Sequence, residues 1–395
     1  MKSSEKLKNI DIRVAVSLLG FLVLLVIVML YKLGSLTKGL SLTEIQTSSY
    51  PVGWHGMYAS PLFLPLKIIQ SIDFKLFIRH GQTLTRLPNV IYGIISIGCF
   101  AGLIRMWHGV RTAVLSSLLF ACGAWVLHVS RVATYDVMYL FGITSLLLMH
   151  QLLYKYDGIA KIWFANLFLW GILLTIPGFV WVVVVDMIFQ REVIADSWRE
   201  FNNLWQRIAA VILPLLFLPL IIPDLFREGQ LLEWLGLPNR FPGILTLLKR
   251  FAAVFYHLLI RGPVYPDLWL ARQPVLDLFV LATCLLGVYF YISKFKSSRS
   301  RLLGLMFIIS ALLVTAGGAV SFTILIPFAY IMSAMGISYL IHNWLIVFPR
   351  NPLARGFGVV LVSLVVAMSC IYNLRSYFVA WPHNQTTITT FSRRL

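Results

Sequence analysis

The stretch IRVAVSLLGFLVLLVIVMLYKL, residues 12–33, decides the fold class of this protein. It has the length of the ~17–25 apolar residues that a membrane-spanning helix needs. It exceeds the ~7–15 residues of a signal-peptide core and has no small-residue cleavage site, so we expect it to be kept as the first helix. Lys2, Lys6 and Lys8 precede it and predict a cytoplasmic N-terminus, because basic residues are retained on that side.

The composition of the whole chain is that of an all-α polytopic membrane protein. Of its 395 residues, 59% are hydrophobic and 12% are charged, whereas soluble domains are ~25% charged. This excludes a soluble, a disordered and a fibrous protein. We expect about 10–11 transmembrane helices in a single domain over residues 1–395, without an internal repeat. The expected spans are 12–33, 88–103, 112–129, 137–153, 162–176, 178–189, 211–222, 275–292, 302–320, 322–341 and 357–372.

Two long stretches do not span and are expected to be extracytoplasmic loops, residues 34–87 and 224–272. In the first of them, residues 61–72 are apolar but short, which allows either an interfacial helix or a tilted span. Pro177 is expected to divide its apolar stretch into two helices joined by a tight turn. Residues 192–207 have apolar positions at helical spacing and predict an amphipathic cytoplasmic segment.

The net charge of +18 divides into two parts. Most of the connections expected in the cytoplasm are short and basic, which is ordinary positive-inside charge. Both long outer loops are also basic, so either this topology is wrong or the outer cations bind an anion. Nucleic-acid binding is the weaker explanation, because the basic residues are scattered between apolar helices. The outer cations are Lys75, Arg79, Arg86, Arg227, Arg240, Lys249, Arg250, Arg261 and Arg272.

Cysteine and motif patterns exclude several kinds of site. All four cysteines lie inside apolar runs, where they behave as small hydrophobic residues, so no disulfide is expected. The chain has no spacing of metal ligands, no glycine-rich nucleotide loop and no nucleophile elbow. No cofactor is therefore expected, although a divalent metal remains open.

Ionisable residues at membrane level are costly and are therefore candidate site residues. Glu44, in the first outer loop, is either a solvated loop residue or a base held at the membrane surface. Arg131 and Asp136 stand on the two sides of an expected outer turn. They form either a local ion pair or a phosphate-binding arginine beside a carboxylate that orients a hydroxyl. Asp186 is expected near the cytoplasmic end, bonded locally.

Other residues in the outer loops are candidates with weaker signals. Arg79 and Arg86 are either interfacial residues or phosphate ligands, since guanidinium groups match phosphate oxygens. The same alternatives hold for the pair Lys249 and Arg250. Three further residues are possible accessories of the site: His55, His80 and Tyr135.

Four segments together resemble the GT-C glycosyltransferases. They are the outer-loop Glu44, SPLFLPL at 60–66, TRLPNVIYG at 85–93 and SRVATYD at 130–136. The closest branch is that of the bacterial relatives of protein O-mannosyltransferases and aminoarabinose transferases (glycosyltransferase family 39). Ile326-Pro327-Phe328 resembles a late proline motif of that family.

The sequence also departs from the family pattern. Thr43 precedes Glu44 where many relatives have a second carboxylate, and Ser321 and Phe322 stand where an arginine or tyrosine often precedes the late proline. The large C-terminal extracytoplasmic domain of several relatives has no counterpart, which puts a protein acceptor bound by a separate domain in doubt.

The resemblance implies a function on the extracytoplasmic face of a bacterial plasma membrane. A sugar would move from a polyprenyl-phosphate donor to a hydroxyl of a glycan, lipid or protein acceptor, with inversion. Glu44 would be the base, with Asp136 orienting it or the acceptor. Arg79, Arg86, Arg131, Lys249 and Arg250 would hold the donor phosphate.

Two other classes of function stay open on the sequence. A transporter or lipid flippase shares the helix count, but would favour internal repeats and broken helices that meet at the membrane midplane. A non-catalytic scaffold subunit would leave Glu44 and Asp136 far apart.

Overall fold

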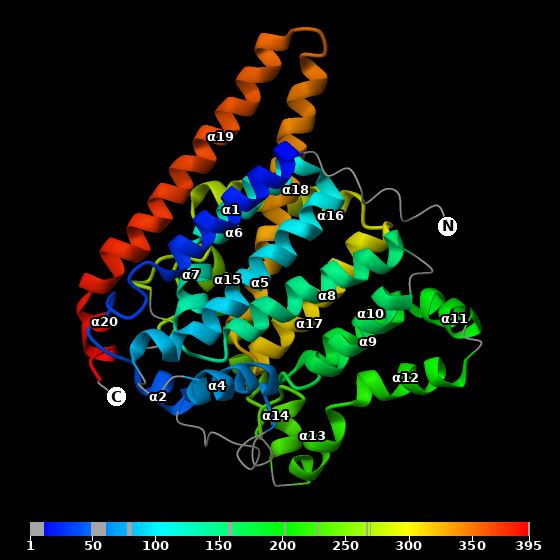
Figure 1. The fold of residues 1–395 in the computed structure, drawn as a ribbon. Helices are drawn as coiled ribbons and strands as arrows, with labels where there is room; N and C mark the ends of the chain where they lie inside the picture. Colours follow the sequence, from blue (N-terminus) through cyan, green and yellow to red (C-terminus); the bar gives the residue numbers. More distant parts are fainter. Residues whose placement is uncertain are drawn as a thin grey trace.

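The structure, a computed structural model, describes residues 12–48, 61–76, 81–156, 160–200, 203–226, 229–265, 268 and 270–393. These residues are mostly helical, with one isolated β-bridge between Leu40 and Arg393 (Figure 1). The helices are α1 (Ile12–Leu30), α2 (Leu42–Ser48), α4 (Leu64–Leu76), α5 (Gln82–His108), α6 (Val110–Cys122), α7 (Ala124–Arg131), α8 (Val137–Lys155), α9 (Ala160–Leu173), α10 (Phe179–Phe189), α11 (Arg191–Glu200), α12 (Leu204–Leu215), α13 (Leu218–Leu225), α14 (Gln230–Trp234), α15 (Ile244–Leu259), α16 (Leu278–Ser293), α17 (Ser298–Ala316), α18 (Ile326–Val347), α19 (Pro352–Arg375) and α20 (Gln385–Thr390), with a 3-10 helix at Phe322–Leu325.

The described helices confirm the polytopic all-α class. Six helical segments are long and apolar enough to cross a membrane, and α6 and α7, bent by 59° at their junction, would make a seventh if the pair is one span. Four shorter apolar helices, residues 20–30, α9, α10 and α16, complete the set of eleven segments in which the sequence predicts spans. Hydropathy therefore sets the polytopic all-α class, but by length and composition six, or up to seven, of the eleven predicted spans are long enough to cross a membrane.

Several boundaries differ from the prediction. The helix expected to begin at Pro88 begins at Gln82, so Pro88 lies inside α5 and Arg86 is helical. The amphipathic segment ends at Glu200, because the apolar span that follows already begins at Leu204. The second long loop contains the helix α15, which packs against α17. The break at Pro177 is confirmed: α9 and α10 are joined by a turn in which Gly178 has a φ of +77°.

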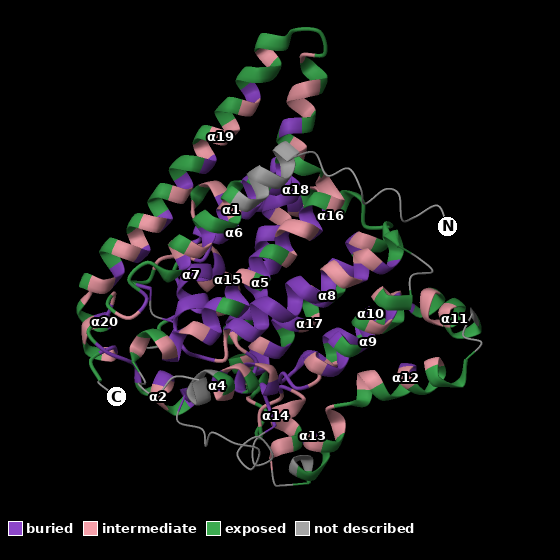
Figure 2. Ribbon diagram, in the orientation of Figure 1, coloured by how far each residue is buried: buried purple, intermediate pink, exposed green. Residues whose placement is uncertain are grey.

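The buried core lies in the middle of the bundle. Figure 2 shows buried residues concentrated in α5, α7 and α8, whereas α12 and α19 present exposed side chains. About the core, α16 and α18 approach so closely that a Cβ on Gly287 would lie 1.8 Å from the Met332 carbonyl oxygen. Small residues of this kind let helices pack without a hydrophobic driving force in lipid. The exposed apolar faces of α12 and α19 are of the kind that lipid covers.

One end of the bundle gathers the short helices. Figure 1 shows α2, α4, α13, α14 and α20 at the lower end of the view, and the connection between α18 and α19 at the opposite end. Helix α4 covers most of the apolar stretch 61–72, which the sequence allows to be either an interfacial helix or a tilted span. The helix is shorter than a span and packs on α5, which favours the interfacial helix. Three of the four segments of the family resemblance meet at this end through the contacts described next, and residues 61–66 of the fourth lead into α4.

Candidate active site

Glu44 lies in the first turn of helix α2 and is completely buried. Its Oε2 accepts a hydrogen bond from the Ser41 backbone N–H at 2.9 Å, and its own N–H donates to Ser41 Oγ at 3.1 Å. This reciprocal pair is a capping box, in which Ser and Glu three residues apart satisfy the free N–H groups of a helix start. The pattern Ser41-Leu-Thr-Glu44 signals this structural role in the sequence, and we had not used that signal.

Arg86, on α5, supplies the charge partner of Glu44. Its Nε lies 2.7 Å from Glu44 Oε1 and its Nη2 lies 3.0 Å from Oε2, so the two groups face each other in bidentate geometry. The guanidinium also donates to the Leu33 carbonyl at 3.0 Å and to Thr37 Oγ1 at 3.0 Å. An isolated charge buried this deeply would be strongly unfavourable, and the paired charges compensate each other. Arg86 therefore binds Glu44 and the end of α1, and its predicted phosphate contact stays a prediction.

The ion pair holds the turn formed by residues 132–136, which we call the Asp136 turn. Glu44 Oε1 accepts from the Ala133 backbone N–H at 3.0 Å. Asn89, one helical turn after Arg86, donates to the carbonyls of Val132 and Thr134 at 2.8 and 2.6 Å. Buried backbone groups that are paired in this way fix the conformation of the turn. The segments quoted for the resemblance are thus joined by hydrogen bonds across more than forty residues of sequence.

Asp136 is the carboxylate that the turn presents. Of residues 131–140, Tyr135 and Asp136 are the two that retain partial exposure. The Thr134 hydroxyl donates to Asp136 Oδ2 at 2.8 Å, and Thr323 Oγ1 donates to the Asp136 carbonyl at 3.2 Å. The late motif near Pro327 therefore supports the same turn through Thr323. Asp136 combines a fixed backbone with a carboxylate that a ligand can reach.

An aromatic stack and a buried lysine adjoin Asp136. The Tyr135 ring stacks on Phe63 with centroids 4.4 Å apart and 1° between the ring planes. Lys67, on α4, is buried, and its Nζ lies 5.5 Å from the centroid of Tyr135. Phe63 has a φ of +57°, a conformation that non-glycine residues adopt at a cost and that clusters at functional sites. We had not selected Lys67, although a lysine in an otherwise apolar stretch is itself a signal.

Arg131 does not pair with Asp136, and the proposed local ion pair is wrong. Its guanidinium points toward the end of α1, where it donates to the carbonyls of Val28 and Tyr31. It also stacks on Phe378, with Cζ 4.6 Å from the ring centroid. Among the residues that the structure describes it contacts no carboxylate. The two residues lie on opposite sides of the turn because residues 132–135 carry the chain away from the end of α7.

The remaining candidates from the sequence differ in where they lie. Arg250 lies against the turn after α17, where its Nη1 donates to the Ala316 carbonyl at 3.1 Å, and it shares a cavity of about 190 Å³ with Phe322. Lys249 is exposed. His55, Arg79 and His80 lie outside the described residues. Within the described ranges no three residues of His, Cys, Asp or Glu are grouped as metal ligands.

Comparison with known proteins starts from the sequence. It matches no protein-family model, and a search of curated proteins gives no match. Similarity to known proteins therefore has to be sought in the structure.

The structure is similar to two crystal structures of ArnT from Cupriavidus metallidurans. The apo structure gives a TM-score of 0.51 at 12% identity, over 95% of this chain and 76% of ArnT. The structure of ArnT bound to undecaprenyl phosphate gives a TM-score of 0.54 at 14% identity, over 93% of this chain and 76% of ArnT. The agreement covers nearly the whole chain and is not limited to a few helices. This chain therefore shares the fold of ArnT, which is a fold that the resemblance of its motifs predicts.

Proposed function

We propose that this protein is a membrane glycosyltransferase that moves a sugar from a polyprenyl-phosphate donor to a hydroxyl acceptor. The observation that carries the proposal is the Asp136 turn: a partly exposed carboxylate on a backbone fixed by Glu44, Asn89 and Thr323. Rigid support of this kind is what a catalytic group needs, because small displacements of reacting groups are costly in rate.

Asp136 is the better base, and Glu44 the better support, in this arrangement. Both oxygens of Glu44 accept two hydrogen bonds each, from Arg86, Ser41 and Ala133. Hydrogen bonds and a paired cation stabilise the ionised form of a carboxylate and make it a weak proton acceptor. Asp136 accepts a hydrogen bond from the Thr134 hydroxyl and is partly exposed. The proposal therefore moves the base from Glu44, our sequence-based choice, to Asp136.

The reaction is a single displacement. Asp136 accepts the proton of the acceptor hydroxyl while the hydroxyl oxygen attacks the anomeric carbon of the donor sugar. The bond from that carbon to the phosphate oxygen breaks, and its electron pair leaves with the polyprenyl phosphate. Attack opposite the leaving group inverts the anomeric centre. Phosphate leaves readily at neutral pH, so no general acid is required.

The leaving phosphate needs cations, and Lys67 is placed for this role. Its ammonium lies 5.5 Å from the ring centroid of Tyr135, the residue before Asp136, and the side chain is buried. A cation in a site from which water is excluded stabilises developing negative charge more than it would in water. The structural likeness to ArnT bound to undecaprenyl phosphate supports a lipid-phosphate donor. Arg131 and Arg250 stay proposed phosphate ligands, with Arg250 nearer to the Thr323 side of the turn.

The direct test is transfer of label by the purified protein. The protein, in lipid nanodiscs, is incubated with radiolabelled polyprenyl-phosphate sugars and with membrane extract as the source of acceptor, and the labelled product is identified. We expect a new labelled product with the wild type, and at least about 100-fold slower formation with Asp136→Asn, the size typical of a lost acid–base group. Asp196→Asn, which removes an exposed carboxylate of α11, is the control and should leave the rate unchanged.

The outcome also separates the proposal from the alternative of a transporter or flippase. A transporter would move the labelled donor across the bilayer of a proteoliposome without forming a new compound. Movement of unaltered donor, with no transfer of sugar from any donor offered, would contradict the proposal.

A further inference from the structure

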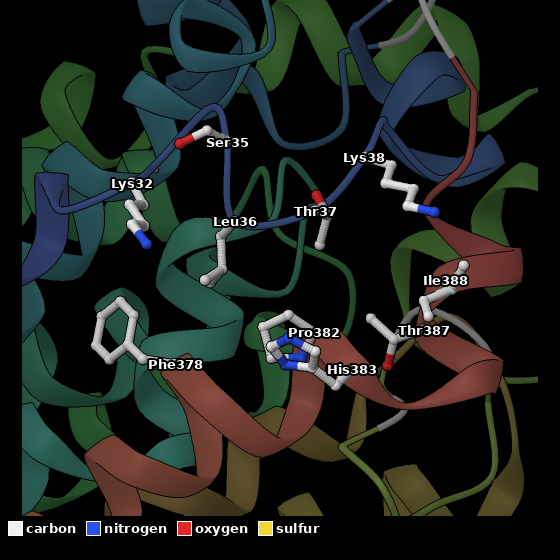
Figure 3. A pocket seen from close by; sticks show the side chains of 10 residues that line it. All are labelled: Lys32, Ser35, Leu36, Thr37, Lys38, Phe378, Pro382, His383, Thr387 and Ile388. Atoms are coloured by element: carbon white, nitrogen blue, oxygen red, sulfur yellow. The ribbon is translucent and has the colours of Figure 1, made fainter.

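Cavities lined by basic side chains lie toward opposite ends of the bundle. One, of about 480 Å³, lies between the chain that follows α1 and the C-terminal segment, with Lys32 and Lys38 on one wall and His383 on the other (Figure 3). It is lined by Thr37, which accepts a hydrogen bond from Arg86, so it belongs with the candidate active site. Another lies at the opposite end, where α18 connects to α19, and shares no residue with that site.

The cavity at the α18–α19 connection, which we call the arginine cavity, is lined by three arginines. Arg111 comes from the start of α6, Arg350 from the connection and Arg355 from the start of α19. The volume is about 700 Å³, within the ~300–1,000 Å³ range of small-molecule sites. Val359 and Val360, one turn further along α19, add an apolar wall. The cavity therefore combines three positive charges with apolar surface.

The positive charge of the arginine cavity is not balanced by acidic side chains. None of the three arginines forms an ion pair with a carboxylate in the part of the chain that the structure describes. The sequence has no Asp or Glu between Asp73 and Asp136, or after Asp277. The arginines thus come from two segments in which every charged residue is basic. A concave surface lined by one sign of charge attracts a ligand of the opposite sign.

The direction of two helices adds to this positive charge. The N-terminus of a helix carries a partial positive charge, which favours Asp or Glu in the first turn. Neither α6 nor α19 has an acidic residue there, and Arg111 and Arg355 stand near their starts instead. Asn351 caps α19 by accepting from two backbone N–H groups, but it brings no charge. Positive-inside charge explains basic residues in connections, but not their convergence on one cavity at two helix starts.

The connection that carries two of these arginines has a fixed shape. Trp344, on α18, donates through Nε1 to the Ala354 carbonyl at 2.7 Å. A Cβ on Gly358 would lie 2.2 Å from the same nitrogen, so a side chain at this position would not fit the close approach of the two helices. Arg355 donates to the Pro349 carbonyl at 3.3 Å across the connection. Groups that are already held in place lose less entropy when a ligand binds.

The surface around the arginine cavity favours a lipid over a soluble anion. Figure 1 shows the α18–α19 connection projecting from the rest of the bundle, and Figure 2 shows exposed side chains along α19. Close to the cavity these side chains are apolar: Leu353, Phe357 and Val360 are 84%, 61% and 62% exposed. Arginines beside an apolar helix face match the two parts of an anionic phospholipid, its phosphate and its acyl chains.

We propose that the arginine cavity binds an anionic phospholipid of the surrounding membrane, at the end of the bundle away from the candidate active site. Arg111, Arg350 and Arg355 bind the phosphate of the headgroup, and the acyl chains lie along the apolar face of α19. Because Arg111 belongs to α6, the bound lipid joins the α18–α19 connection to the bundle. The inference does not depend on the proposed transferase function, since it involves none of the residues to which that function is assigned.

The test measures binding of radiolabelled phosphatidylglycerol to the purified full-length protein in micelles of an uncharged detergent. We expect saturable binding by the wild type. The triple variant Arg111→Gln/Arg350→Gln/Arg355→Gln should bind at least about tenfold more weakly, because each basic residue contributes to the attraction of an anionic lipid. Absence of saturable binding by the wild type would overturn the proposal.

The matched control is Lys294→Gln/Lys296→Gln/Arg301→Gln, which removes the same charge from exposed positions at the connection between α16 and α17. It should bind like the wild type, and equal weakening by the two triple variants would overturn the assignment to this cavity. Thermal unfolding in lipid-free micelles checks that each variant is folded. Added phosphatidylglycerol should raise the unfolding temperature of the wild type more than that of the cavity variant, because a ligand stabilises the state that binds it.

A single substitution tests whether the cavity is shared between two segments of the chain. Arg111→Gln leaves the α18–α19 connection unaltered and should still weaken binding, by about threefold. Binding equal to that of the wild type would overturn the role of α6 in the site.

Unlabelled competitors separate a lipid from a soluble anion. Phosphatidylcholine carries the same phosphate with a compensating cation and should compete at least about tenfold less well than phosphatidylglycerol. Glycerol 3-phosphate has the phosphate without acyl chains and should not displace the lipid. Equal competition by phosphatidylcholine would overturn the recognition of net charge, and displacement by glycerol 3-phosphate as effective as that by phosphatidylglycerol would overturn the assignment to a lipid.

Discussion

Among the described residues two carboxylates are completely buried, Glu44 beside the turn that precedes helix α8 and Asp186 beside His150 in the later part of α8, and they have different partners. Glu44 pairs with Arg86 and accepts from the backbone N–H groups of Ser41 and Ala133. Asp186 accepts from side chains alone: Trp170 Nε1 at 2.9 Å, Gln190 Nε2 at 2.9 Å and His150, whose Nδ1 lies at 2.7 Å. The first cluster fixes loop backbone, and the second joins three helices.

This difference teaches that burial of a charge does not by itself identify a site. The Glu44 cluster holds the irregular segment that presents Asp136, whereas the Asp186 cluster holds helices whose backbone is already hydrogen-bonded. Arginine is always charged, so removal of Glu44 leaves an unpaired ion, whereas histidine can lose its proton. The predictions below break one cluster at a time.

The largest effect is expected from Glu44→Gln. It leaves the buried guanidinium of Arg86 without a counterion, which costs about 3–5 kcal/mol of stability for a buried pair. Thermal unfolding of the purified protein measures the loss, with Glu192→Gln on exposed α11 as control. The double variant Glu44→Leu/Arg86→Met should recover most of the stability but not the transfer activity. An unchanged unfolding temperature for Glu44→Gln would show that the ion pair is not formed.

The second effect concerns activity. Asp136→Asn should slow transfer at least about 100-fold, equivalent to about 2.7 kcal/mol in the activation barrier. Thermal unfolding should be unchanged, because the amide can still accept from Thr134. A loss of only a few-fold would contradict a base role for Asp136 and would return that role to Glu44.

The third prediction compares equivalent truncations in the two clusters. Asn89→Ala removes two hydrogen bonds to the carbonyls of the Asp136 turn, and should cost about 1–3 kcal/mol in stability and also lower the transfer rate. Asn166→Ala removes a hydrogen bond to Gln190 in the Asp186 cluster and should cost stability without changing the rate per folded molecule. Equal loss of rate in both variants would show that the two clusters do not differ in function.

The smallest effect is expected from Asp186→Asn. The amide oxygen still accepts from Trp170 or Gln190, so the cost is about 0.5–1.5 kcal/mol, that of one hydrogen bond. Transfer activity, measured with the labelled donor, should stay within about twofold of wild type. This is well below the tenfold change in rate that corresponds to about 1.4 kcal/mol in the activation barrier. A larger loss would place a functional role at this end of α8.

The elements that the sequence predicted best are those whose evidence is local. Hydropathy alone gave the apolar spans, and the proline at position 177 gave the break between α9 and α10. The helix boundaries were predicted less well. Pro88 suggested a helix start, but α5 begins at Gln82. The buried residues Thr85 and Arg86 pack against neighbouring segments, which favours the earlier start. Asp186 was expected to be bonded within its surroundings, and it is.

The candidate site was predicted in part. The sequence selected Glu44, Arg86, Arg131 and Asp136 as polar groups in an apolar chain, and the structure brings the segments that carry them to one end. The sequence did not show that Arg131 faces α1, that Lys67 lies beside Tyr135, or that the C-terminal segment closes a cationic pocket.

The sequence by itself determined the membrane class, the positions of the apolar segments and the short list of charged candidates, because transfer of apolar side chains into lipid depends on each segment alone. Only the tertiary structure decided that Glu44 is completely buried and that Asp136 is partly exposed. Glu44 meets Arg86 and Ala133 across 42 and 89 residues of chain, and such pairings depend on how helices pack. Electrostatic roles follow from these distant contacts, since a partner within a few ångströms changes what a buried charge can do.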